Sequence, residues 1–217
     1  MSEMPEIPDA WPADDDAGTD GRVVPIFPLS NVWLVPNAVF PLHVFEARYR
    51  KLVDDVIDRA GDFVLGTVVD GHESDMPDAP PVYPMAGLGT IHRYEHLPDG
   101  RYLIMLAGRE RVFVEEVESD EPYRKVKIRS IDETPAPDHL EGALREELTS
   151  AILDRTEELL NLPEDLPVGC LADLLTLRVN PEHAQWHAIY TELDVERRVQ
   201  LALAAHKQDR AGEDPTL

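Results

Sequence analysis

Two H-x-x-x-H pairs are the first places at which this sequence could bind a metal ion. His92 and His96 lie in a predicted strand, where residues four apart are roughly 13 Å apart, too far to share one zinc ion. His183 and His187 lie in a predicted helix, where such residues share a face, but no third ligand is adjacent and the Glu of H-E-x-x-H is missing. We therefore expect an ordinary amphipathic helix, with no metal and no cofactor.

Motifs for phosphate binding and acyl transfer are absent from the sequence. None of the 12 glycines is followed by Lys, so no Gly-Lys-Ser/Thr loop could cradle a phosphate, and no G-x-S-x-G turn presents a nucleophilic serine. Gly87-Leu88-Gly89 lies in a predicted strand without the helix of a dinucleotide fingerprint, so strand packing explains it better. These absences predict a protein that is not an enzyme.

The single cysteine, Cys170, excludes an intramolecular disulfide. It precedes an apolar run at a predicted helix start, where we expect a small hydrophobic residue and not a reactive thiol. A chain without disulfides is consistent with a reducing compartment. The N-terminus has neither the basic nor the apolar part of a signal peptide, and no apolar run approaches 18 residues. We therefore expect a cytoplasmic protein.

The charge balance limits the partners of this chain. Its 217 residues carry 43 acidic and 20 basic side chains, a formal charge of −23. Such a field repels nucleic acid and anionic membrane surfaces, so neither is expected to bind. Apolar residues make up 43% of the sequence, enough for a sizeable core in one or two domains.

The first elements that position side chains lie between residues 23 and 61. Residues 23–29 and 32–35 are apolar runs punctuated by prolines, which predict short edge strands and bends. The period then changes, because apolar residues recur at helical spacing until Gly61, the expected C-cap. That stripe consists of Tyr49, Leu52, Val53, Val56 and Ile57.

Further strands are predicted at residues 63–69, 87–97, 101–107, 111–118 and 123–131. Pro98-Asp99-Gly100 is a turn signal that joins two of them as a hairpin, whereas residues 70–86 form a long loop. The last strand alternates apolar Val126 and Ile128 with Lys125, Lys127 and Arg129. With Arg124, these cations form either a solvated strand face that discourages edge-to-edge pairing or a docking strip for acidic partners.

Helices are predicted in the rest of the chain. Asp138 could cap a helix that runs to about residue 160, with Glu141 completing a capping box. A second helix is expected at 168–177, a third from Asn180-Pro181 and a fourth from Asp194 to 205. Strands first and helices second indicate an α+β fold. The predicted organisation is a disordered acidic tail (1–22), a β-rich subdomain (23–133), a helical subdomain (138–209) and a short tail (210–217).

Several motifs resemble the Lon protease N-terminal, substrate-binding domain family. The opening signature comprises Phe27-Pro28-Leu29, Pro36 and PLHVFEARY from Pro41 to Tyr49. Gly89-Thr90-Ile91, LPDGR from Leu97 to Arg101 and GRERV from Gly108 to Val112 resemble the central hairpin and the strand after it. LADLL from Leu171 and DVERR from Asp194 resemble the helical C-terminal part. The similarity is collinear over roughly 180 residues, far beyond one short motif.

The resemblance implies a β-rich, PUA-like pseudo-barrel followed by a C-terminal helical bundle. It also implies a non-enzymatic module, here without the family's ATPase and peptidase domains, that binds unfolded or exposed apolar polypeptide segments. Binding would use apolar surface between the two halves or pairing with a strand edge. The expected peptide-binding residues are Phe27, Phe40, Phe45, Glu46, Arg48 and Tyr49.

Alternative interpretations remain open at this point. Glu46, Arg48 and Tyr49 could instead form a helix cap, an ion pair and part of the core. The chain could be an adaptor that docks a specific folded partner, such as a protease or regulatory enzyme, with its acidic tail steering association. A small-molecule enzyme ranks last, and the oligomeric state is left open.

Overall fold

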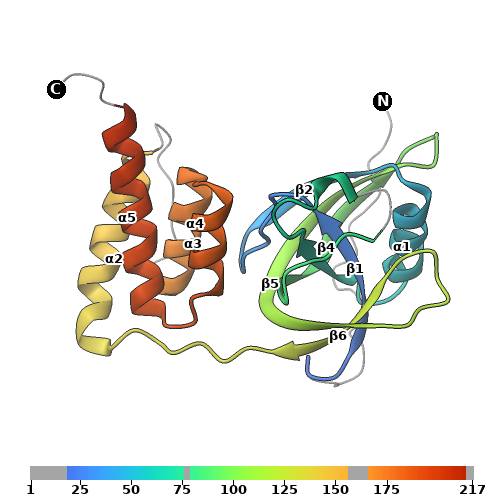
Figure 1. Cartoon of the computed structure of the whole chain (residues 1–217), viewed down its shortest axis with the longest axis horizontal. Helices are drawn as coiled ribbons and strands as arrows, with labels where there is room; N and C mark the ends of the chain where they lie inside the picture. The colour runs from blue at the N-terminus through green and yellow to red at the C-terminus, as the bar shows by residue number, and fades with distance from the viewer. Residues whose placement is uncertain (1–18, 76–78, 156–165, 214–217) are drawn as a thin grey trace. The chain divides into compact units, whose positions relative to one another are not determined.

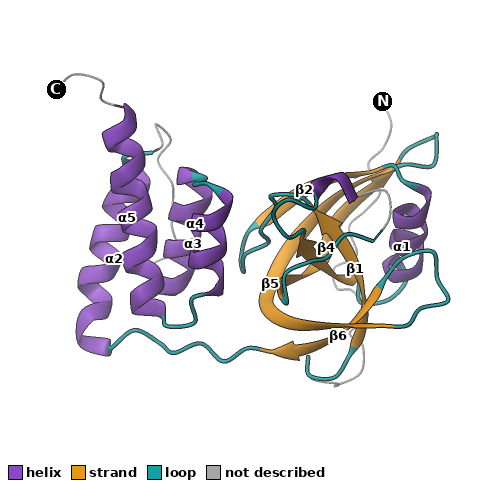
Figure 2. Cartoon of the chain, in the orientation of Figure 1, coloured by secondary structure: helices purple, strands orange, loops and turns teal. Residues whose placement is uncertain are grey.

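The computed structural model describes residues 19–75, 79–155 and 166–213. The chain divides into two compact units, residues 1–131 and 132–217. All strands belong to the first unit, and helices α2 to α5 to the second (Figures 1 and 2). The fold is therefore α+β, with a β-rich part followed by helices, as predicted.

The first unit is built around one sheet. Its elements are β1 (Val23–Leu29), β2 (Val39–Val44), α1 (Ala47–Ile57), β3 (Asp62–Thr67), the short 3₁₀ helix η1 (Glu73–Asp75), β4 (Met85–His96), β5 (Tyr102–Val117) and β6 (Lys125–Ser130). The strand order is β2-β5-β4-β3-β1-β6, and β6 also pairs with β5. This second pairing closes five strands into a barrel, to which β2 is added along β5. Only β1 and β3 are parallel among these pairs.

Strand β5 runs through both parts of the sheet. It pairs with β4 on one side, and on the other with β2 along residues 102–107 and then with β6 along residues 112–117. The sequence predicted two strands here, at 101–107 and 111–118. The structure instead has one long strand with an irregularity at Arg109, where the β4–β5 register shifts. Such a bulge bends a strand without ending it, which explains the difference.

The proline-rich opening differs from the prediction of edge strands. Strand β1 pairs with both β3 and β6 despite Pro25 and Pro28, so it is not an edge strand. Residues 32–35 form no strand, although Trp33, Leu34 and Val35 are almost fully buried. They form a buried crossing over β4 and β5.

Glycines in β4 and β5 permit this crossing. A Cβ atom on Gly87 would lie 2.4 Å from the carbonyl oxygen of Leu34, and one on Gly108 would lie 2.1 Å from that of Val35. Both distances are shorter than real contacts allow, so a side chain at either position would displace the crossing backbone. The interpretation of Gly87 as a packing glycine is therefore confirmed.

Helix α1 covers one apolar cluster of the barrel. Its stripe, Tyr49, Leu52, Val53 and Val56, is buried as the helical period predicted. The helix ends earlier than expected, at the C-cap Asp58, and Gly61 follows with a positive φ of 70°. The Gly61 N–H donates to the Val56 carbonyl, so the glycine closes the turn beyond the helix.

Residues 19–22 are anchored to the barrel, which corrects the assignment of 1–22 to a disordered tail. The Gly21 N–H donates to the Ile128 carbonyl, and the Asp20 carboxylate accepts from the Ser130 N–H. Arg22 pairs with the buried carboxylate of Asp62 at 2.9 Å. Residues 1–18, which include the acidic run at 14–16, lie outside the described residues.

The second unit packs four helices around one core. They are α2 (Asp138–Leu153), α3 (Val168–Val179), α4 (His183–Thr191) and α5 (Val195–Glu213). Their shared cluster includes Leu148, Ile152, Leu171, Leu175 and Val199, all at most 1% exposed. The predicted extension of the first helix to residue 160 falls mostly outside the described residues. Helix α5 continues to Glu213, past the boundary predicted at 209.

The helix caps differ from the sequence-based predictions. The N-cap of α2 is Pro137, so Asp138 is the first helical residue and forms no capping box. Asn180 ends α3 in the left-handed conformation and does not start α4, whose N-cap is Glu182. The Asn180 side chain accepts a hydrogen bond from the Trp186 indole at 3.3 Å. Asn tolerates a positive φ, so it serves as a C-cap here.

Arg198 is the most buried charged residue among the described residues of the helical unit. Its guanidinium, 1% exposed, donates two hydrogen bonds to the carboxylate of Glu133, at 2.6 and 2.7 Å. The carboxylate of Asp173, also buried, lies 3.7 Å away. A bridge between Thr134 and Asp194 runs beside this pair. The start of the second unit is thus fixed to helix α5.

Candidate functional site

Strands β2 and β5 place apolar side chains on both faces of their pairing. Leu42 and Val44 on β2 and Ile104 and Leu106 on β5 are buried, as a period of two requires for the core face. The alternate residues face outward. These are Val39, Pro41 and His43 on β2, and Leu103 and Met105 on β5.

Large apolar side chains are concentrated on this outer face. Seven of them are exposed in the described part of the chain, and four lie here: Val39 (50% exposed), Phe45 (61%), Leu103 (42%) and Met105 (37%). Exposed apolar residues are common one by one, but a contiguous group is typical of a contact surface. We call the group of Val39, Pro41, His43, Phe45, Leu103 and Met105 the β2–β5 surface.

A shallow pocket of about 480 Å³ opens on the β2–β5 surface. Strand β4 contributes Arg93, Tyr94 and Glu95 to its lining, beside Leu103 and Met105. Arg93 and Glu95 lie opposite Met105 and Leu103 in the β4–β5 register. An apolar floor with charged groups at its margin suits an apolar side chain that projects from a longer polypeptide.

Strand β2 presents an open edge beside this pocket. It pairs with β5 along its length, and no strand lies on its other side within the described residues. Pro41 has no N–H group to donate, so it leaves the β2–β5 hydrogen bonds intact only if its backbone nitrogen points toward the open edge. Backbone groups of alternate residues point to the same side of a strand, so the N–H groups of Val39 and His43 then also point toward the open edge. The hydrogen bond from the Gly108 N–H to the Ala38 carbonyl agrees with this arrangement, because it shows that the backbone groups of even-numbered residues here point toward β5.

Two of the predicted peptide-binding residues lie in the core. Phe27 is 6% and Tyr49 3% exposed, and their rings stack with centroids 4.1 Å apart. Burial raises the pKa of the Tyr49 hydroxyl, and the Arg48 guanidinium above its ring opposes that shift. Their assignment to a surface groove is therefore wrong, since a polypeptide could reach neither ring. The alternative interpretation, Tyr49 as a core residue, is confirmed.

The other four predicted residues lie at or near the β2–β5 surface. Phe40 is partly buried against the core, whereas Phe45 is the most exposed large apolar residue in the described chain. The ring of Phe45 lies 5.9 Å from that of His43. Glu46 is the N-cap of α1 without a capping hydrogen bond, and its carboxylate accepts a bond from Arg48 at 3.1 Å. Their role in binding stays a prediction.

The sequence-based interpretation missed Val39, Leu103 and Met105. The signal was present, because the turn at Pro98-Asp99-Gly100 fixes which residues of the second hairpin strand face outward. Leu103 and Met105 are outward-facing in a strand whose inward residues are already apolar. A strand that is apolar on both faces is either buried on both faces or presents one apolar face for contact with another molecule.

Two tyrosine–aspartate pairs lie beneath the barrel's strands. The Tyr102 hydroxyl donates to Asp54, and the Tyr123 hydroxyl donates to Asp55 at 2.8 Å. Burial, followed by the hydrogen bond to Asp54, raises the pKa of Tyr102 to about 12. Burial, followed by the hydrogen bond to Asp55, also raises the pKa of Tyr123. Both phenols therefore stay protonated at neutral pH, and they join α1 to β5 and to the segment before β6.

The remaining candidates for chemistry are the two histidine pairs and Cys170. His92 and His96 lie on β4, and His183 and His187 lie on α4, as predicted. No group of three His, Cys, Asp or Glu side chains that could hold a metal ion occurs in residues 19–75, 79–155 and 166–213. Cys170 lies in the first turn of α3 and is only half-buried.

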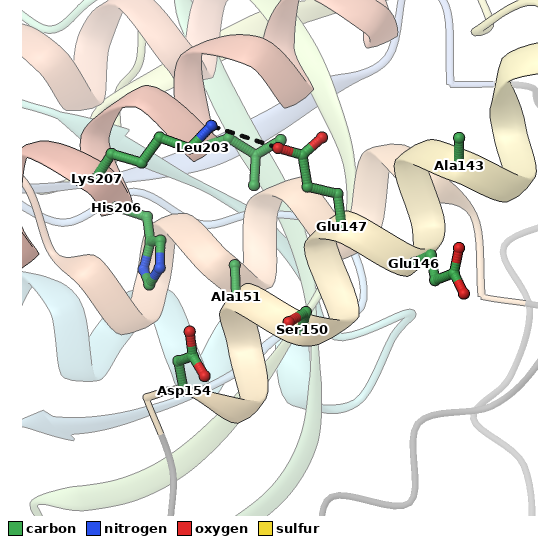
Figure 3. Close-up of a pocket in the computed structure, with 9 residues that line it drawn as sticks. All are labelled: Ala143, Glu146, Glu147, Ser150, Ala151, Asp154, Leu203, His206 and Lys207. Carbon is green, nitrogen blue, oxygen red and sulfur yellow. Dashed lines mark hydrogen bonds and ion pairs between the residues drawn. The ribbon is translucent and has the colours of Figure 1, made fainter.

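A second pocket, of about 470 Å³, lies between α2 and α5 (Figure 3). Polar side chains and apolar ones both line it, among them Glu146 and Ser150 from α2, Asp154 at the C-cap of α2 and His206 from α5. The Lys207 ammonium and the Glu147 carboxylate are 3.4 Å apart across it. Its apolar part consists of Ala143, Ala151 and Leu203. Among the described helices, none is long and apolar enough to cross a membrane.

Comparison with known proteins places this geometry in a family. The family model described as the ATP-dependent protease La (LON) substrate-binding domain matches residues 23–212. The Lon protease of Flavobacterium johnsoniae is 30% identical over 162 residues, covering 73% of this chain and 19% of that protein. The Lon protease of Dictyoglomus thermophilum is 28% identical over 187 residues, covering 82% and 23%. The chain thus spans about a fifth of the length of these proteases.

Solved structures show the same fold. The N-terminal domain of the Mycobacterium avium complex Lon protease aligns with a TM-score of 0.66 and 18% identity, covering 86% of this chain and 98% of that one. A Lon N-terminal domain protein from Xanthomonas campestris aligns with a TM-score of 0.61 and 23% identity, covering 84% and 98%. The family resemblance predicted from the sequence is confirmed. The chain belongs to the Lon substrate-binding domain family.

Proposed function

We propose that this chain is a non-enzymatic module that binds unfolded polypeptide, or exposed apolar segments of it, on the β2–β5 surface. The observation that carries the proposal is the contiguity of exposed apolar side chains with the open edge of β2. An extended segment could pair with that edge and place alternate side chains over Leu103 and Met105. Membership in a substrate-binding family supports a binding role.

The absence of catalytic motifs from the sequence supports binding without catalysis. The sequence has no phosphate-binding loop, and the hydroxyls of the two buried tyrosine pairs are bonded to carboxylates. The formal charge of −23 disfavours nucleic acid and anionic membranes as ligands. One cysteine is compatible with a reducing compartment, so we keep the cytoplasm as the proposed location.

The proposal is tested by titrating the protein into a fluorescently labelled, permanently unfolded polypeptide and measuring anisotropy. The folded form of the same polypeptide serves as the control ligand. We expect saturable binding to the unfolded form only. Leu103→Ser combined with Met105→Ser should weaken this binding about tenfold or more, because two apolar contacts are lost. Binding to the folded form alone would instead support an adaptor for a folded partner.

A matched control variant tests whether binding depends on the β2–β5 surface or on exposed apolar area anywhere on the protein. Leu153→Ser combined with Leu201→Ser removes two leucines of similar exposure, 45% and 38%, from the helical unit. This control should bind like the parent protein. His43→Pro removes the edge N–H inferred above without removing apolar area, and it should weaken binding if a strand is added there. Equal loss in the leucine control would exclude the β2–β5 surface as the site, provided circular dichroism shows intact folds.

A further inference from the structure

We propose that the outer face of β6 docks an acidic, extended segment of a partner protein, at a site separate from the β2–β5 surface. The residues that form it are Lys125, Lys127 and Arg129, which we call the β6 strip. They follow one another at alternate positions, so all three project from the same face of the strand. Between them, Val126 and Ile128 are buried in the core.

The position of β6 removes the simplest explanation for these cations. Lysines on an edge strand discourage pairing with other chains, and the sequence left that role open for this strand. In the structure, β6 pairs with β1 on one side and with β5 on the other. A strand paired on both sides has no edge to protect. The concentration of positive charge therefore needs another reason in a chain with a formal charge of −23.

The three cations lack ionic partners within the described residues. Glu115 lies opposite Lys127 in the β5–β6 register, yet no carboxylate lies within 4.0 Å of the charged atoms of the β6 strip in that part of the chain. Neighbouring Arg124 contrasts with them, because both its Nε and Nη2 atoms donate to Glu116 at 2.7 Å. Within residues 19–75, 79–155 and 166–213, no carboxylate therefore neutralises the charges of the β6 strip.

Aromatic rings hold two of these cations in place. The Lys125 ammonium lies 5.7 Å from the centroid of the Tyr123 ring, and the Arg129 guanidinium lies 5.7 Å from that of Phe113. Both distances are within the range of cation–π attraction. Such support reduces the side-chain freedom that an incoming carboxylate would have to restrict. It leaves the charge unneutralised.

The spacing of the β6 strip defines the ligand. Alternate residues of a strand are roughly 6.6 Å apart, so the strip presents three charges over roughly 13 Å. An extended polypeptide repeats its side chains at the same interval, which suits a segment with carboxylates at alternate positions. Val23, 53% exposed, lies opposite Lys127 and adds apolar contact beside the charges.

The test uses the 217-residue chain and a short labelled peptide of alternating Glu and Thr, with binding measured by anisotropy at low salt. We expect saturable binding that weakens as salt is added. Replacing Lys125, Lys127 and Arg129 together by Gln should raise the Kd about tenfold. A peptide of alternating Lys and Thr tests for charge sign and should not bind this strip.

The control variant replaces Arg101, Arg197 and Lys207 by Gln, which removes the same charge from exposed positions outside β6. It should bind the acidic peptide like the parent protein. Equal weakening by both variants, or absence of binding by the parent, would overturn the proposal. So would tighter binding of a single-stranded oligonucleotide that depends on the same three cations, since the strip would then be a nucleic-acid site.

The same experiment keeps the two proposals apart. The Leu103→Ser and Met105→Ser variant should retain acidic-peptide binding, and the β6 variant should retain binding of the unfolded polypeptide. Loss of acidic-peptide binding in both variants would show one shared surface and would overturn a separate site on β6.

Discussion

At the scale of single residues, Arg198 is a buried cation that joins several parts of the helical unit. It is buried between the carboxylates of Glu133 and Asp173, and Gly169 leaves it room, because a Cβ there would lie 2.5 Å from its Nη2 atom. The motif DVERR pointed to this helix, but two adjacent arginines look alike in sequence. Only packing distinguishes Arg198, 1% exposed, from Arg197, 71% exposed at its side chain.

Replacing Arg198 by Ala should lower the free energy of unfolding by roughly 3 kcal/mol or more, because Asp173 is then left buried without its cation. The matched substitution Arg197→Ala should change it by less than about 0.5 kcal/mol. Urea denaturation followed by circular dichroism measures both. Similar values for the two variants would contradict the role given to Arg198.

His206 makes the helical unit sensitive to mild acid. Burial, followed by repulsion from Arg155, lowers the pKa of its imidazole below the ordinary 6.5. Arg155 donates to the His206 Nδ1 atom at 3.0 Å, so that nitrogen is the unprotonated acceptor. The nearby charges from both elements are Asp154, Arg155, Asp209 and Arg210. Burial and the charge of His183 likewise lower the pKa of His187.

We expect the free energy of unfolding to fall as the pH drops from about 7.5 to 5.5. As the pH falls, these histidines are protonated in the unfolded chain before they are protonated in the folded one, because their pKa is higher in the unfolded chain. The stability that the neutral histidines contribute is therefore present above pH 6.5 and is lost below it. His206→Gln, which keeps a neutral side chain, should make this fall smaller. An unchanged pH profile in the variant, measured by urea denaturation at each pH, would exclude His206 as its source.

At the scale of elements, the helices and the hairpin were predictable, whereas the pairing of β1 was not. The period of α1 and the turn at residues 98–100 are local signals that the sequence carries in full. Pro25 argued against a strand paired on both sides, but pairing with β6 joins residues about a hundred positions apart, and no local pattern contains that information. Asn180 misled for a related reason, since Asn favours both a helix start and a left-handed helix end.

The errors at the predicted site also arise because local sequence does not contain the tertiary arrangement. Phe27 and Tyr49 were grouped with Phe40 and Phe45 because all four lie in the opening signature. Their spacing along the chain does not distinguish a ring that faces the core from one that faces solvent, because the backbone bends between β1 and α1. The open edge of β2 depends on which strands are its neighbours, and that is known only from the assembled sheet.

The crossing of residues 32–35 over β5 leaves no room for a side chain at Gly108. Gly108→Ala should destabilise the barrel by about 1–3 kcal/mol or more, because its Cβ would meet the Val35 carbonyl at 2.1 Å. Gly142→Ala is the control, since Gly142 lies in α2 with nothing within 4 Å of the added atom. That substitution should stabilise the protein by about 0.5–1 kcal/mol. Two stabilised variants in a denaturant titration would contradict the close approach.

At the scale of the whole molecule, the chain combines a large negative charge with two local exceptions. One is the apolar β2–β5 surface and the other is the basic β6 strip, and both border the same side of β5. The formal charge of −23 led us to expect no binding of nucleic acid or anionic membranes, but a sum over 217 residues does not show where positive charge is concentrated. The sequence identified the cations of residues 124–129, and only the closed sheet showed that they protect no edge.

The closure of the barrel by β6 also determines when β1 can complete its pairing during synthesis. Strand β1 is translated before both of its partners, and one of them ends only at Ser130. Until that strand has been made, β1 exposes an unpaired edge, and every contact across the closing seam is long-range and slow to form. The barrel therefore becomes complete only after β6 has been translated, about a hundred residues after β1. During that interval the unpaired edge of β1 is open to pairing with a strand of another chain.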